Sequence, residues 1–158
     1  MALSKGTNSY VTVEEANAYF VDRIDAAAWT DASDSQKAQA LVTATSQLDQ
    51  MRWLGSVVSS EQPLAFPRDG EYLDTRLGFT VAFKTPTPDR IIKATYELAY
   101  HLLNNDGLLD ETGRVATLQV AGIALTDISS TQKVPSVVRN LIACMLTGGG
   151  SRQVWRAN

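Results

Sequence analysis

Four stretches of the chain carry apolar side chains at the helical period. The first follows Thr12 and Glu15, whose spacing is that of a capping box, in which each side chain bonds the backbone N–H of the other residue. The second spans about residues 35–54, the third follows the helix-start signal Thr87-Pro88-Asp89, and the fourth begins near Val134. We therefore predict a mainly α fold in which four helices form the core.

The same stripes predict which helix faces are buried. The first helix is expected to bury four side chains: Val13, Ala16, Phe20 and Ile24. The last helix is expected to bury six: Val134, Val137, Val138, Leu141, Ile142 and Met145. On the third helix, four polar residues predict a solvated side: Arg90, Lys93, Glu97 and His101. Trp29 and Trp53 are expected to pack at the edges of this core.

Residues 55–88 lack a helical period, because four of the five prolines and three glycines fall there. We predict a long irregular loop over 55–88. Alternating apolar residues near its end, Leu77, Phe79, Val81 and Phe83, indicate a short strand whose free edge could pair with a neighbouring chain. A β-compatible stretch further on predicts a small hairpin at about 115–128 that turns around Gly122.

Phe66 and Arg68 lie in the middle of the long loop and are candidates for contact with a partner. Two interpretations of Arg68 stay open. Its guanidinium could bond backbone carbonyls and pin the loop to the domain, or it could contact another subunit.

The three glycines at 148–150 predict a hinge between one helical domain over 1–146 and a flexible arm over 147–158. In the arm, Trp155 lies between Arg152 and Arg156, and these residue types are enriched where binding energy concentrates in protein interfaces. Together with Val154, these three residues are our candidates for partner contact.

The charge of the chain limits the kinds of partner. Its 14 basic and 17 acidic residues give a net charge of −3, and the two arginines of the arm leave the domain at −5. A sequence-independent single-strand binder requires a basic groove with stacked aromatic rings, so an acidic domain argues against one. Any contact with DNA would have to be local.

One histidine and one cysteine are too few for the usual His/Cys zinc site or for an internal disulfide. The chain also lacks a phosphate-binding loop, a nucleophile elbow and a paired-cysteine motif. The longest plain apolar run, Leu141 to Leu146, is too short to cross a bilayer. We therefore predict a protein of binding or assembly, with no enzymatic activity, no cofactor, no metal and no membrane partner.

Several motifs in order resemble a family of small proteins of tailed bacteriophages. They are the segments Ser9 to Tyr19, Trp29, Lys37 to Asp49, Gln62 to Arg68 and Pro88 to Ala99. The Gln62 to Arg68 segment is the most specific, being similar to a Q-x-L-x-[WF]-P-R pattern. The resemblance covers roughly residues 8–146. Proteins of this kind are encoded among virion genes and often carry the label of DnaT-like single-stranded-DNA-binding proteins.

The resemblance implies a mostly helical head-tail adaptor, a structural virion protein without catalysis. Such a protein would form a homo-oligomeric ring, commonly of twelve copies, between the portal protein and a tail or stopper protein. Genomic DNA would pass through the ring without being gripped, and the protein would be found in the host cytoplasm during assembly and at the head-tail interface of the virion. The alternative is a single-stranded-DNA-binding protein of phage replication, in which Arg152, Trp155, Arg156 and Arg68 contact the strand.

Overall fold

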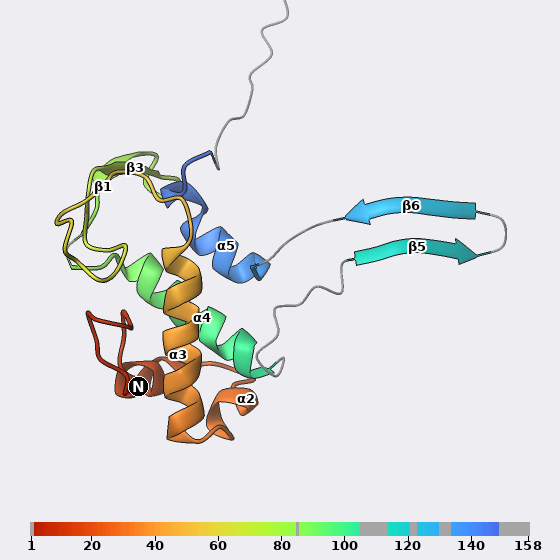
Figure 1. Cartoon of the computed structure of the whole chain (residues 1–158), viewed down its shortest axis with the longest axis horizontal. Coiled ribbons are helices and arrows are strands. Elements are labelled where there is room, and N and C mark those ends of the chain that lie inside the picture. The colour runs from red at the N-terminus through yellow and green to blue at the C-terminus, as the bar shows by residue number, and fades with distance from the viewer. Residues whose placement is uncertain (1, 85, 105–113, 121–122, 130–133, 149–158) are drawn as a thin grey trace, which may run out of the picture.

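The computed structural model describes residues 2–84, 86–104, 114–120, 123–129 and 134–148. Within them the chain forms five α-helices: α1 (Val13–Val21), α2 (Ala27–Thr30), α3 (Asp34–Asp49), α4 (Asp89–Asn104) and α5 (Ser136–Ile142), the last followed by the 3₁₀ turn η1 (Ala143–Met145). Six short strands form three antiparallel pairs: β1 (Ser56–Val57) with β2 (Arg68–Asp69), β3 (Glu71–Asp74) with β4 (Phe79–Ala82), and β5 (Arg114–Val120) with β6 (Ile123–Ser129). The fold is thus mixed, with helices predominant (Figure 1).

Side-chain caps determine where the first two long helices begin. The Thr12 hydroxyl accepts from the Glu15 N–H and the Glu15 carboxylate accepts from the Thr12 N–H, so the predicted capping box is confirmed. Ser33 and Gln36 form a second capping box at the start of α3. Each box satisfies backbone donors that have no partner within the helix.

The core surrounds α4, which packs against α2, α3 and α5. Half of its residues are buried: Ile91, Ala94, Thr95, Tyr96, Glu97, Leu98, Ala99 and Leu102. Segments outside the helices also supply large apolar side chains to this core, among them Trp53, Leu64, Phe66 and Phe83. A core made by four helices alone is therefore not confirmed. Trp29 and Trp53 are both buried, as expected.

Several predicted boundaries and faces are wrong. The second long helix ends at Asp49, because Gln50 leaves the helix, and not near residue 54. Ile24 lies beyond α1 and is 94% exposed, and Val137 is also exposed because α5 directs Val138 and Ile142 to the core. Glu97, expected on a solvated side, is buried, and the Tyr19 hydroxyl of α1 and the Arg23 guanidinium just beyond α1 bond its carboxylate.

The loop over 55–88 is irregular, as predicted, but it contains four of the strands. The short strand expected near Phe79 is present as β4, and it pairs with β3 of the same chain. The expected hairpin is confirmed by β5 and β6, which extend away from the helices in Figure 1. Its turn at Gly122 lies outside the described residues.

Hydrogen bonds attach the middle of this loop to the helical core. The Tyr10 hydroxyl donates to the Asp49 carboxylate, which also accepts from the Ala65 N–H at 3.2 Å. Burial of the carboxyl raises the pKa of Asp49. The peptide bond between Phe66 and Pro67 is cis. Since one carboxylate holds both the N-terminal segment and the loop, the two are positioned together at the end of α3.

Gly55 and Gly78 both lie in the loop over 55–88, but only Gly55 is closely packed against other backbone atoms. Both have a positive φ, 71° and 77°, which costs any other residue about 1 kcal/mol or more. A Cβ on Gly55 would collide with the Asp69 carbonyl, whereas a Cβ on Gly78 would meet nothing within 4 Å. We expect Gly78→Ala to lose about 1 kcal/mol of unfolding free energy and Gly55→Ala to lose clearly more, measured by urea denaturation. Equal losses would show that the approach of β2 to Gly55 is looser than described.

Candidate functional site

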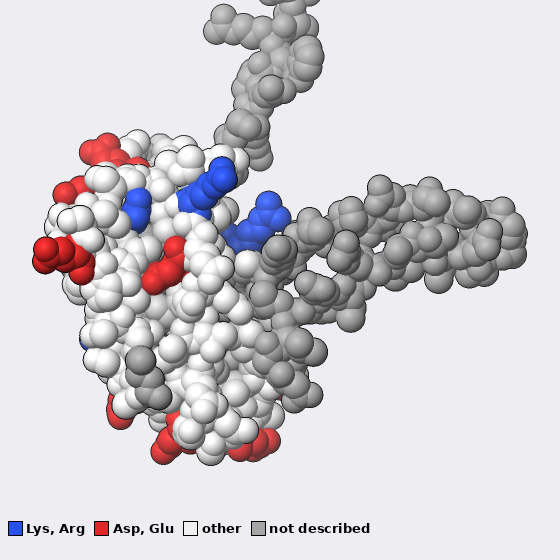
Figure 2. Space-filling model, viewed as in Figure 1, with Lys and Arg blue, Asp and Glu red and all other residues white. Residues whose placement is uncertain are grey.

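Charge is distributed unevenly over the molecule. Residues 1–49, which form α1 to α3, contain seven acidic and three basic residues, whereas residues 50–104 contain six of each. Figure 2 shows the Lys and Arg side chains of this face gathered near α5, while Asp and Glu lie both at the end formed by α2 and the start of α3 and over the region of β1 and β3. An anionic ligand is therefore favoured at the α5 end.

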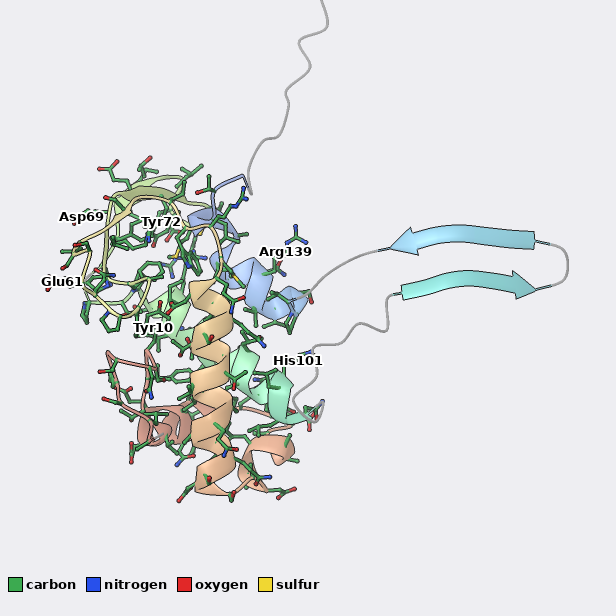
Figure 3. All side chains as sticks on the ribbon, in the orientation of Figure 1. Tyr10, Glu61, Asp69, Tyr72, His101 and Arg139 are labelled. Carbon is green, nitrogen blue, oxygen red and sulfur yellow. The ribbon has the colours of Figure 1, made fainter. Side chains whose placement is uncertain are left out.

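Three exposed cations at the α5 end are not neutralised. Arg52 follows α3, Lys93 lies one turn after Arg90 in α4, and Arg139 lies in α5. Within the described part of the chain, none of the three forms an ion pair or a side-chain hydrogen bond. Figure 3 shows Arg139 pointing away from α5, on the opposite side of the view from Glu61 and Asp69.

Backbone pairing brings Arg52 beside the last described residues. The Thr147 N–H donates to the Arg52 carbonyl at 2.8 Å, and the Leu54 N–H donates to the Met145 carbonyl at 2.9 Å. Trp53 and Leu146 form an antiparallel bridge between these bonds. Thr147, the first residue of the arm predicted over 147–158, therefore lies next to Arg52.

A buried ion pair connects α4 to the β3–β4 hairpin at this end. The Arg90 guanidinium donates to the Asp74 carboxylate at 2.8 Å, and the side chain of Asp74 is 5% exposed. The Arg76 N–H also donates to this carboxylate, at 2.9 Å. This backbone bond, with the charge of Arg90 beside it, lowers the pKa of Asp74 below its ordinary value. The ion pair fixes the hairpin against α4 and α5.

The tip of this hairpin exposes apolar side chains. The Leu77 and Gly78 N–H groups donate to the Asp74 carbonyl, closing the turn between β3 and β4. Leu77 is 47% exposed and Phe79 is 58% exposed. Arg76 lies in the same turn with its side chain exposed. An exposed arginine and an exposed phenylalanine thus lie three residues apart in the sequence at this turn.

A second set of buried polar groups, near the middle of α4, serves a structural role. The Glu97 carboxylate accepts from the Tyr19 hydroxyl at 2.7 Å and from the Arg23 guanidinium at 2.5 Å. Burial, with the Glu97 carboxylate beside it, raises the pKa of Tyr19 to about 12. Arg23 also lies over the Tyr100 ring, 4.5 Å from its centroid. These charges compensate each other and leave none for a ligand.

The structure places two of the candidate contact residues inside the fold. Phe66 is 3% exposed and packs edge-on against the rings of Tyr10 and Trp53. Arg68 donates to the Leu54 carbonyl at 2.8 Å, and to the Gly55 and Ala65 carbonyls at 2.6 and 3.3 Å. This is the loop-pinning arrangement of the two alternatives.

The other four candidates, Arg152, Val154, Trp155 and Arg156, lie outside the described residues. Arg52 and Phe79 are surface features that the sequence does not predict. Arg52 belongs to no motif, and Phe79 falls in an apolar alternation that gives no sign of its exposure.

The described residues contain no group of three or more His, Cys, Asp or Glu side chains that could hold a metal ion. None of the described helices is long and apolar enough to cross a membrane. Cys144 is partly buried in η1, and burial raises the pKa of its thiol.

A family model described as "Putative DnaT-like ssDNA binding protein" matches residues 2–157, and the chain belongs to this family. No curated protein and no solved structure is similar enough to match the chain. The family description indicates association with DNA.

The expected head-tail adaptor was wrong. The family to which the chain belongs is described by single-stranded-DNA binding, and nothing in the match indicates a virion connector, a ring, a portal or a tail partner. The adaptor expectation rested on the resemblance to phage virion proteins, and the negative net charge argues against the DNA-binding alternative only if it is spread over the whole surface. Most of the acidic excess lies in residues 1–49, so the total says little about the α5 end.

The Asp74–Arg90 ion pair predicts a specific acid sensitivity. The folded-state pKa of Asp74 is lowered, so the pair stabilises the fold above the ordinary value of 3.8, and this contribution is lost as the pH falls below it. We expect Asp74→Asn to lower the urea midpoint at neutral pH, and the gap from the wild-type protein to shrink well below pH 3.8. Asp69→Asn removes an exposed carboxylate of the same loop and is the control. A gap that is constant with pH would contradict the ion pair's role.

Proposed function

We propose that the protein binds single-stranded DNA at its α5 end, without a catalytic step. The observation that carries the proposal is the family match over residues 2–157. The structure supports it with three exposed, unpaired cations at this end: Arg52, Lys93 and Arg139. Phosphate groups are the natural partners of such cations, and neutralising them releases counterions from the strand.

The arm belongs to the same proposal. We propose that Arg152 and Arg156 contact phosphates and that Trp155 stacks on a base, because base stacking on aromatic rings is tolerant of sequence. The arm follows the Thr147–Arg52 pairing directly, so its residues start beside the cations of the α5 end. An acidic body would then repel the strand from the α1–α3 end and restrict binding to one side of the molecule.

Salt dependence tests the cations of the α5 end. We expect the wild-type protein to bind a fluorescein-labelled oligothymidylate in an anisotropy titration, with an affinity that falls as NaCl rises. For single strands each phosphate contact contributes a slope of about −0.7, so the double variant Arg52→Gln/Arg139→Gln is expected to lower the slope by about 1.4. Lys5→Gln, which removes a charge at the far end of the molecule, is the control. An unchanged slope in the double variant would remove these residues from the interface.

Truncation tests the arm. A chain that ends at residue 148 retains the Thr147–Arg52 pairing and every packed helix. We therefore expect its urea midpoint to equal that of the full chain, while its affinity for the oligothymidylate decreases. A truncated chain that binds as tightly as the full one would show that the arm does not contact DNA.

A further inference from the structure

Phe79 differs from the other aromatic residues that the structure describes. Each of the others contacts another ring: Tyr10, Tyr19, Phe20, Trp29, Trp53, Phe66, Tyr72, Phe83, Tyr96 and Tyr100. Phe79 contacts none of them and is 58% exposed. Exposure of this ring costs free energy unless a ligand covers it.

The hairpin holds this ring in a fixed place. Phe79 pairs directly with Asp74 in the β3–β4 register, and Asp74 is the residue that the Arg90 guanidinium bonds. The two hydrogen bonds to the Asp74 carbonyl close the turn between them. A ring on such a turn loses little conformational freedom when a ligand stacks on it, so more of the contact energy appears as affinity.

The surroundings of the ring fit a nucleotide. Leu77 adds apolar surface in the same turn, and Arg76 places an exposed guanidinium three residues before the ring. An unpaired base offers an uncharged face to the ring, while its phosphate can meet the guanidinium. A protein partner would be favoured by a larger apolar surface without the adjoining charge.

Hydrogen bonds connect the hairpin to the α5 end of the molecule. Arg90 bonds Asp74 of β3 and, at 3.5 Å, the Leu141 carbonyl of α5. Six residues beyond Leu141, Thr147 bonds the Arg52 backbone. The segment over 141–147 therefore joins the two features. Asp69 and Glu71, at the other end of the hairpin, disfavour a strand that runs the opposite way.

We infer that Phe79 is a base-stacking residue for single-stranded DNA, with Arg76 contacting the adjoining phosphate. The inference rests on the proposed function and adds a site that neither the family description nor the sequence pattern assigns. It makes the β3–β4 hairpin the part of the protein that distinguishes unpaired bases from duplex DNA, because only unpaired bases can stack on a side chain.

The test compares Phe79→Leu with Phe79→Trp in the full chain. Leucine keeps the apolar contact and removes the ring, and we expect roughly 5- to 100-fold weaker binding to the oligothymidylate, with the preference over duplex reduced. Tryptophan restores a ring, so we expect binding to be retained and the added fluorescence to be quenched by the oligonucleotide. Leu73→Ala, at a residue of β3 that is 53% exposed, is the matched control and is expected to bind as the wild type does.

The possible outcomes separate the inference from the proposed function. If the wild-type protein binds the oligothymidylate and Phe79→Leu binds equally well, the stacking inference is overturned and the proposed function stands. If the wild-type protein does not bind at low salt, both are overturned. The urea midpoint of Phe79→Leu is expected to match that of the wild type, because the ring packs against no other ring.

Discussion

The burial of α4 is the constraint on which the rest of the structure depends. This helix carries two charged residues that cannot be left without partners: Glu97 near its middle and Arg90 at its first turn. Removing a charge from water is costly unless an opposite charge and hydrogen bonds compensate for it. Tyr19 of α1 and Arg23, two residues beyond α1, bond Glu97, and Asp74 of β3 bonds Arg90. The two sets of contacts therefore fix α1 near the middle of the helix and the hairpin at its first turn.

This arrangement also separates positive from negative surface. Arg23, which follows α1, forms an ion pair with Glu97. Its charge therefore does not offset the acidic residues of α1 to α3, which remain in excess at that end. At the α5 end Asp74 forms a buried ion pair with Arg90, so its negative charge does not offset the exposed cations nearby. Pairing charges inside the fold thus sharpens the difference between the two ends of the surface. A polyanion approaching the molecule is therefore favoured near the exposed cations beside α5 and disfavoured at the α1–α3 end.

Local sequence patterns predicted the parts of the fold that local interactions determine. The capping box of Thr12 and Glu15 and the start of α4 depend on residues within one turn, and both were predicted correctly. The burial of Glu97 was not predictable, because its partner Arg23 is 74 residues away. The role of Arg68 stayed between two alternatives for the same reason. Its carbonyl acceptors come from the adjacent residues Leu54 and Gly55 and from Ala65, which only the folded chain brings together.

The exposure of Phe79 at the candidate site could not be predicted from the sequence for a different reason. Phe79 and Phe83 are equivalent in the apolar alternation along the strand, yet Phe83 is buried and Phe79 is exposed. Alternation predicts that the two rings lie on one side of a strand, but β4 spans only Phe79–Ala82, so Phe79 begins the strand next to the turn and Phe83 follows its end. Phe83 packs against the Phe66 and Tyr72 rings, whereas Phe79 contacts no ring of the described residues. An aromatic residue left exposed beside a turn that also carries an arginine is available for stacking in a way that no sequence period records.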